Sequence, residues 1–191
     1  RRMILDTFPD HGIIGEEFGE HAAKAEYCWV LDPIDGTKSF VSGMPTWGTL
    51  IGLSRHGRPC YGMMHQPFTR EAFYGDGETA SWRGPNRHHE LAVRKLRTRA
   101  CADLAAATLM TTSPLLIPEA LRPAFYEVEK QVRLSRYGGD CYAYCMLAAG
   151  HVDLVVEAAL QPYDIVALIP IVQGAGGVIT TWDGEDAARG G

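Results

Sequence analysis

The pattern of apolar runs changes near the middle of the chain, and this change limits the folds that the chain can adopt. Between residues 47 and 74, strand-length apolar runs are separated only by turn signals such as His56-Gly57 and Gln66-Pro67, which is typical of an antiparallel meander. After residue 107, strand-length and helix-length runs alternate. Because alternating strands and helices pack as layers, we predict a layered α/β architecture.

Glycine, proline and aspartate residues mark the ends of the predicted elements. The predicted strands cover residues 13–14, 27–31, 49–53, 60–65, 72–74, 107–112, 132–135, 152–156 and 178–181. The predicted helices cover residues 1–8, 36–41, 118–130, 141–149 and 164–173. We expect the strand over 27–31 to break at Asp32-Pro33, and we expect Pro170 to bend the last helix.

The first predicted helix has no start signal and stops at Pro9-Asp10, and the chain ends in a polar stretch. We therefore expect that the sequence is cut from a larger fold. Residues 1–191 are assigned to a single domain with two lobes. The first, about residues 1–85, has the antiparallel sheet, and the second, about residues 100–191, has the alternating elements.

Composition excludes several classes of protein. Of the 191 residues, 46% are hydrophobic and 21% are charged, as in ordinary proteins with a buried core. The apolar stretches are too short to cross a bilayer and no signal peptide is recognisable, so we expect a cytoplasmic location. A net charge of −5 argues against binding to nucleic acid or acidic membranes. The five cysteines form no CxxC pair, which indicates reduced thiols and no zinc motif.

Three acidic clusters stand where predicted elements end: Glu16-Glu17, the run from Asp32 to Thr37, and Asp164. In the middle cluster a buried strand ends in Asp32, a turn stiffened by proline follows, and Asp35 comes three residues later. Two such carboxylates can converge on a hard cation, which prefers oxygen ligands. The N–H groups of Gly36 and Thr37 would then face outward at a helix start, where a phosphate can bind.

Each of these residues also has a simpler interpretation. Glu16 and Glu17 fit a solvated surface, and Asp35 or Asp164 fits a helix N-cap. The glycines at 174, 176 and 177 follow a helix rather than a strand, so a dinucleotide-binding loop is rejected.

The three clusters together resemble the inositol monophosphatase-like family. The run from Trp29 to Thr37, WVLDPIDGT, matches its signature, and the preceding IGEE at 14–17 matches its metal-binding glutamate motif. Tyr163-Asp164, followed by Ala-Gly-Gly at 175–177, matches its C-terminal signature. Two departures are Tyr163, where many members have tryptophan, and Pro170.

The resemblance implies a five-layer α-β-α-β-α sandwich, here without its N-terminal helices and extreme C-terminus, in a homodimer that requires two or three Mg²⁺ ions. It implies that the metal ligands are Glu16, Asp32, the carbonyl of Ile34, Asp35 and Asp164. It also implies that Glu16, Thr37 and Asp35 are catalytic and that Gly36 and Thr37 bind the phosphate. The substrate would be a small phosphate monoester, whose negative charge must be neutralised before water can attack.

The segment from Tyr137 to Tyr144 narrows the range of possible substrates. Its Gly-Asp-Cys-Tyr form resembles the histidinol-phosphate phosphatase branch of the family, which releases L-histidinol and phosphate in histidine biosynthesis. L-Histidinol phosphate has an ammonium and an imidazole group, and Asp140 and Glu157 are candidate anionic partners for them. The simpler interpretation is that Asp140 caps the helix that starts at Cys141.

Three alternatives remain. Two are enzymes of the same superfamily: an inositol-1-phosphate phosphatase, and a nucleotide or sugar bisphosphatase. The third belongs to another class, a member of the family that binds a protein or RNA partner and has only vestigial catalysis. Turnover of a phosphate ester without any partner separates the third from the others.

Overall fold

A computed structural model describes all residues, 1–191, and its largest element is an eight-stranded sheet. The strand order is β2-β1-β3-β4-β5-β6-β7-β8, and only the β1–β3 pair is parallel. The strands are β1 (Gly12–Gly15), β2 (Gly19–His21), β3 (Tyr27–Asp35), β4 (Gly48–Arg55), β5 (Arg58–Gln66), β6 (Glu71–Gly75), β7 (Ala80–Pro85) and β8 (Leu91–Lys95). Strands β4 to β6 form the predicted antiparallel meander, which β3 extends on one side and the unpredicted strands β7 and β8 extend on the other.

The second half of the chain forms a small parallel sheet and most of the helices. Its strands, in the order β10-β9-β11, are β9 (Thr108–Thr111), β10 (Leu134–Tyr137) and β11 (Leu154–Val155). The helices are α1 (Arg2–Thr7), α2 (Thr37–Val41), α3 (Arg122–Glu129), α4 (Asp140–Ala148), α5 (Pro162–Ile165) and α6 (Leu168–Gly174). Short 3₁₀ turns lie at Leu104–Ala106, Pro114–Leu116 and Ala187–Arg189. None of the helices has the length and apolar character needed to cross a membrane.

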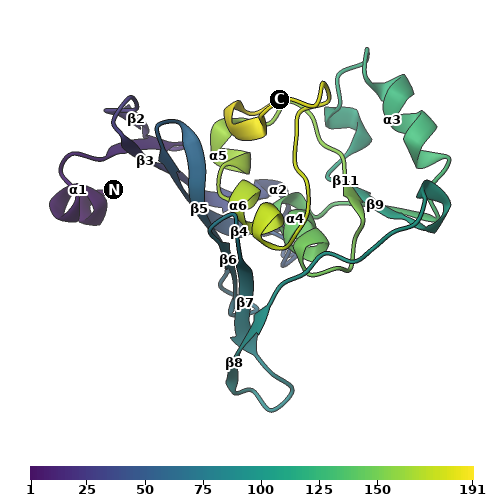
Figure 1. Ribbon diagram of the computed structural model, residues 1–191, viewed down its shortest axis with the longest axis horizontal. Coiled ribbons are helices and arrows are strands. Elements are labelled where there is room, and N and C mark those ends of the chain that lie inside the picture. Colours follow the sequence, from purple (N-terminus) through teal and green to yellow (C-terminus); the bar gives the residue numbers. More distant parts are fainter.

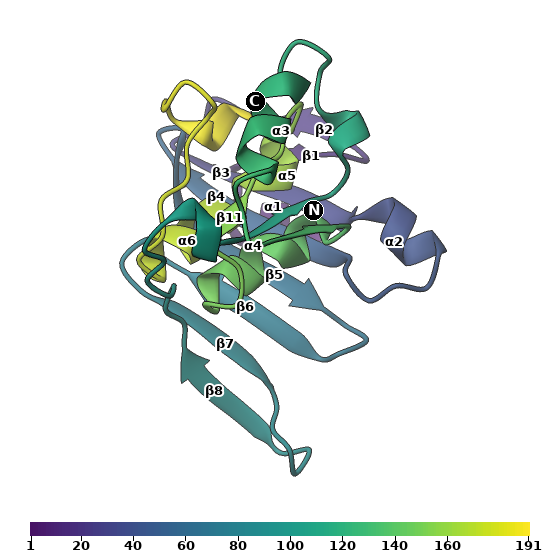
Figure 2. The ribbon, with the colours of Figure 1, turned by 90° about the vertical axis from the view of Figure 1, so that its right-hand side faces the viewer.

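The elements stack in the predicted layers. Helices α4, α5 and α6 lie between the two sheets, α3 lies beyond the small sheet, and α1 lies on the opposite side of the large sheet (Figure 1). Figure 2 shows the same three central helices in front of one face of the large sheet. The order of layers is therefore that of an α-β-α-β-α sandwich, with α1 alone in the first helical layer.

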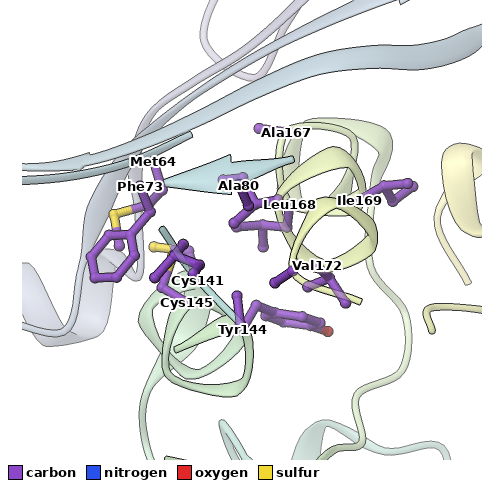
Figure 3. Packing of buried hydrophobic residues seen from close by; sticks show 14 of the residues in the cluster. Met64, Phe73, Ala80, Cys141, Tyr144, Cys145, Ala167, Leu168, Ile169 and Val172 are labelled. Carbon is purple, nitrogen blue, oxygen red and sulfur yellow. The ribbon is translucent and has the colours of Figure 1, made fainter. Parts of the chain in front are cut away.

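The main core lies between the large sheet and the central helices. Phe73 and Met64 on the sheet face Cys145 on α4 and Leu168 on α6, and all four side chains are fully buried (Figure 3). The other face of the sheet also has apolar side chains, but they are only partly covered. One-sided burial explains the alternation of buried and partly exposed residues along β4 and β5.

A row of glycines lets the central helices approach the large sheet. Gly52, Gly62 and Gly75 are direct partners across β4, β5 and β6. A Cβ atom on Gly62 would lie 1.8 Å from the carbonyl oxygen of Ala167, and one on Gly75 would lie 2.6 Å from that of Pro170. The backbone around α6 therefore rests directly on the backbone of the sheet, with no side chains between them.

Two predicted elements are wrong in the structure. The helix predicted over 164–173 is divided into α5 and α6 at Val166 and Ala167. Pro170 explains the break, because it has no N–H to donate to the carbonyl of Val166 four residues earlier. The strand predicted over 178–181 is absent. There the N–H of Thr181 bonds to the carbonyl of Glu185 in a local turn, at 2.9 Å, rather than to a neighbouring strand.

Other predicted bounds shift. Strand β3 does not break at Asp32-Pro33 but continues to Asp35 through an irregularity in its pairing with β4. Helix α3 starts at Arg122 instead of residue 118, β10 lies two residues later than predicted, and β11 is reduced to Leu154–Val155.

The glycine row yields a stability prediction. Gly62→Ala should destabilise the protein by about 1–3 kcal/mol or more, because its new methyl group must displace the backbone at Ala167. Gly15→Ala is the matched control, since a Cβ there meets no atom closer than 3.6 Å. Urea unfolding of both variants measures the difference. Equal and small effects would show that the helices do not rest on this row.

Candidate metal and phosphate site

Three carboxylates converge at one end of the large sheet. They are Asp32 and Asp35 on β3 and Asp164 on α5, and one oxygen from each lies within 4.8 Å of the others. Asp32 is 2% exposed, and the other two are partly buried. An all-oxygen donor set of this kind suits a hard divalent cation such as Mg²⁺.

Glu16 lies beside this cluster because β1 and β3 run parallel. Gly15 on β1 is paired with Leu31 on β3, so Glu16 and Asp32 both follow at the carboxyl end of the pair. The backbone N–H of Glu16 donates to the carbonyl of Leu31 at 3.2 Å. Glu16 is exposed and lies outside the group of three, but its charge affects both Asp32 and Asp164.

An irregularity in β3 puts Asp32 and Asp35 on the same side of the sheet. In a regular strand, residues three apart point to opposite faces. Here Asp32 pairs with Leu50 and Asp35 pairs with Gly48, so three steps along β3 match two along β4. The extra residue of this bulge restores the common direction of the two carboxylates. The Asp32 carboxylate also accepts the N–H of Ile34, at 2.9 Å, which stabilises the turn.

Helix starts provide hydrogen-bond donors to the other two carboxylates. Asp35 accepts the N–H of Cys141 in the first turn of α4, at 2.7 Å. Asp164 accepts the N–H of Gln161 at 2.7 Å and forms a capping box at the start of α5. The N-cap interpretation of Asp164 is therefore wrong, because the N-cap of α5 is Gln161 and Asp164 is the third residue of the helix. Asp35 does not cap the helix that follows it, and its carboxylate reaches α4 instead.

Crowding of negative charge raises the pKa values in this site. Burial, followed by the charges of Asp35 and Glu16, raises the pKa of Asp32 to about 8. Burial raises the pKa of Asp35 to about 7, although the hydrogen bond from Cys141 opposes the rise. Burial and the charge of Glu16 also raise the pKa of Asp164. A bound divalent cation would reverse these effects by neutralising the charge that the carboxylates share.

The predicted phosphate-binding site, called here the phosphate seat, consists of Gly36 and Thr37 and follows directly after β3. Gly36 has a φ of 82°, a left-handed conformation that glycine adopts without strain, and α2 begins at Thr37. The Thr37 hydroxyl donates to the carbonyl of Ile34 at 3.2 Å. That carbonyl is one of the predicted metal ligands, and its second lone pair remains available. The roles of Gly36, Thr37 and Ile34 stay predictions.

The predicted substrate residues line a cavity of about 250 Å³ next to the carboxylates, together with Asp35 and Asp164. Glu157 accepts the backbone N–H and the hydroxyl of Thr112, at 2.6 and 2.8 Å. Asp140 is the first residue of α4, but its side chain makes no capping hydrogen bond. It accepts the hydroxyl of Ser39 on α2 instead, at 2.7 Å.

Sequence reasoning missed Thr112 and Ser39 near this cavity, and it gave Thr46 no role there, although the segment Thr46 to Thr49 also resembles the histidinol-phosphate phosphatase branch. Thr112 stands at the carboxyl end of a predicted strand, a position that is a signal for a site residue. Ser39 gives no such signal, because it meets Asp140 across 101 positions of the sequence.

Fold and site together define a layered α/β protein with a cluster of carboxylates, suited to a divalent cation, at the end of its large sheet. Residues 1–190 match the model of the inositol monophosphatase family, and the chain belongs to this family.

Individual relatives agree with this assignment. The chain is 46% identical over 186 residues to the bifunctional phosphatase IMPL2, chloroplastic, of Arabidopsis thaliana, a match that covers 96% of the chain and 51% of that protein. It is 35% identical over 194 residues to a histidinol-phosphatase of Mycobacterium tuberculosis, of which it covers 73%. An inositol monophosphatase from Zymomonas mobilis superposes with a TM-score of 0.86 at 39% identity, covering 97% of this chain and 69% of that one. The chain thus spans about half the length of the Arabidopsis relative.

The raised pKa values predict how stability depends on pH without metal. Between about pH 4, the ordinary value for aspartate, and about pH 8, the folded state binds more protons than the unfolded state. The free energy of unfolding must therefore fall as pH rises through this range. We expect the Tm in EDTA to decrease from about pH 5 to about pH 8, and added Mg²⁺ to raise the Tm most at the upper end.

Asp32→Asn tests the origin of this dependence. It removes one buried carboxylate, so the Tm in EDTA at about pH 8 should increase and the decrease with pH should become smaller. Asp10→Asn, on an exposed turn, is the matched control and should leave the profile unchanged. A Tm that rises with pH in EDTA would contradict the argument.

Proposed function

We propose that this chain is a Mg²⁺-dependent phosphatase that hydrolyses a small phosphate monoester. The observation that supports this most directly is the convergence of Asp32, Asp35 and Asp164 within 4.8 Å. We assign the metal ligands to Glu16, the three aspartates and the carbonyl of Ile34. The related proteins described above are themselves named as phosphatases.

The residues assigned above would hold two or three Mg²⁺ ions, and the bound ions would supply charge neutralisation for the phosphate and a lowered pKa for water. The protein positions that water. The Thr37 hydroxyl donates its single hydrogen to the carbonyl of Ile34, so its oxygen is left to accept a hydrogen from the water. Glu16 takes the proton, and Asp35, held by the N–H of Cys141, keeps its carboxylate directed at the site. The N–H groups of Gly36 and Thr37 hold the phosphate oxygens.

The proposed substrate is L-histidinol phosphate, which is converted to L-histidinol and phosphate in histidine biosynthesis. Its ammonium and imidazole groups would lie in the cavity lined by Asp140 and Glu157. Burial and the charge of Asp140 raise the pKa of Glu157, although hydrogen bonds from Thr112 and Thr111 oppose this rise. The two carboxylates therefore form a concentrated negative region, which a cationic substrate would stabilise.

The alternatives explain this cavity less well. A neutral polyol such as that of inositol-1-phosphate could donate hydroxyl hydrogens to these two carboxylates, but it has no positive charge to balance theirs. A bisphosphate needs a cationic partner for its second phosphate, and no Lys or Arg lines the cavity. A partner-binding protein with vestigial catalysis would not need the carboxylate cluster.

The family resemblance also implies a homodimer, and this oligomeric state remains a prediction.

Metal removal tests the proposed reaction. EDTA should abolish turnover and Mg²⁺ should restore it, whereas Ca²⁺ should substitute poorly because its looser coordination orients water less well. Asp32→Asn should lower kcat by several orders of magnitude, since it removes a ligand and its charge. A panel of phosphate esters, assayed without any partner protein, measures both effects and ranks the substrates. Full activity in EDTA would overturn the proposal.

Asp140→Asn tests the proposed substrate. The change keeps the size of the side chain but removes its charge, so kcat/KM for histidinol phosphate should fall roughly tenfold to a thousandfold. Turnover of p-nitrophenyl phosphate, which has no cation, should change far less. Equal losses on both esters, with a lower Tm, would mean that Asp140 is structural.

A further inference from the structure

Two hydroxyl groups hold the carboxylate of Asp140 in place. Thr46 donates its hydroxyl hydrogen to the Ser39 oxygen at 2.9 Å, and Ser39 donates to one oxygen of Asp140 at 2.7 Å. All three residues are partly buried. Because each hydroxyl has one hydrogen, the direction of the relay is fixed: it runs from Thr46 through Ser39 and ends at the carboxylate.

The backbone of Asp140 requires such support. Its φ is 45°, in the left-handed region that residues other than glycine seldom adopt. The two residues before it are glycines, Gly138 and Gly139, so the chain that leads into α4 has few side chains to fix it. The bond from Ser39 occupies only one carboxylate oxygen and leaves the other without a protein donor.

Asp140 also lies directly against the predicted phosphate seat. A Cβ atom on Gly36 would lie 2.9 Å from both the Cβ and the Cγ of Asp140. The start of α2 and the start of α4 therefore meet at this contact, although they come from opposite halves of the chain. A ligand with its phosphate at Gly36 would have its other end near Asp140.

The loop after α2 keeps Thr46 in reach of Ser39. The N–H of Met44 donates to the carbonyl of Ser39 at 2.9 Å, which folds the loop back on the helix. Phe40 and Trp47 pack edge to face with their ring centroids 4.9 Å apart and close the base of the loop. The two donors of the relay are thus held by α2 and the loop after it, and only the acceptor, Asp140, belongs to α4.

We propose that Ser39 and Thr46 are positioning residues for substrate selection, which aim the free oxygen of Asp140 at the cationic end of the substrate. This inference rests on the proposed function, and it extends that function from Asp140 to two residues that do not touch the substrate. They act by fixing the torsion of the Asp140 carboxylate relative to the phosphate seat. Loss of the relay therefore weakens the binding of cationic substrates and leaves the chemical step intact.

Ser39→Ala, assayed with Mg²⁺, should lower kcat/KM for histidinol phosphate roughly threefold to thirtyfold, mainly through KM. Turnover of p-nitrophenyl phosphate should change much less. Ser39→Thr retains a hydroxyl and should restore most of the loss, and Thr46→Ala should give a smaller loss of the same kind. Ser81→Ala, which deletes a hydroxyl on the outer face of the large sheet, is the matched control.

A double-mutant cycle separates positioning from folding. If Ser39 acts through Asp140, adding Ser39→Ala to Asp140→Asn should cause little further loss of kcat/KM. Additive losses, or equal losses on both esters, would overturn the inference and leave the proposed function standing. A wild-type protein that does not hydrolyse histidinol phosphate but hydrolyses p-nitrophenyl phosphate would overturn the proposed substrate, and the inference with it.

Discussion

The site depends on the close contact between the large sheet and the backbone around α6. Gly52, Gly62 and Gly75 lie side by side across three strands, and the carbonyl of Ala167 occupies the space that a side chain on Gly62 would fill. This contact fixes α5 as well, because only two residues separate it from α6. Asp164 on α5 is thereby held against the end of β3. A side chain in the glycine row would move the third carboxylate away from the other two.

The cost of this arrangement is electrostatic. Burial of the carboxylates, together with their mutual repulsion, raises the pKa values of Asp32 and Asp35 to about 8 and about 7. The N–H groups at the starts of α4 and α5 offset part of the repulsion, through Cys141 and Gln161. The remaining charge would favour the binding of a divalent cation. Stability and proposed activity therefore oppose each other at the same residues.

The two halves of the chain meet around the cavity, and each contributes different chemistry. The first half supplies Glu16, the end of β3 and the start of α2, where the phosphate seat and all proposed metal ligands except Asp164 lie. The second half supplies Asp140 and Glu157, which are held by Ser39 and Thr112 respectively. Because the proposed substrate contacts come mainly from the second half, a change of substrate would not require a change in Asp32 or Asp35. This separation fits a family whose members are named for different phosphate esters.

Local patterns in the sequence determined the strands of the meander, the layered architecture and the identity of the clustered carboxylates, because alternation, turn residues and a compact motif act over a few positions. Tertiary structure alone decided the rest. The face of the sheet to which the Asp35 side chain points depends on the bulge in β3 opposite β4. Pro170 predicted a bend in the last helix, but not the complete break between α5 and α6. The apolar residues at 178–181 looked like a strand, yet a strand exists only where a neighbouring backbone accepts its hydrogen bonds. The relay from Thr46 through Ser39 ends at Asp140, 101 positions away in the other half of the fold, and no short-range pattern records that contact.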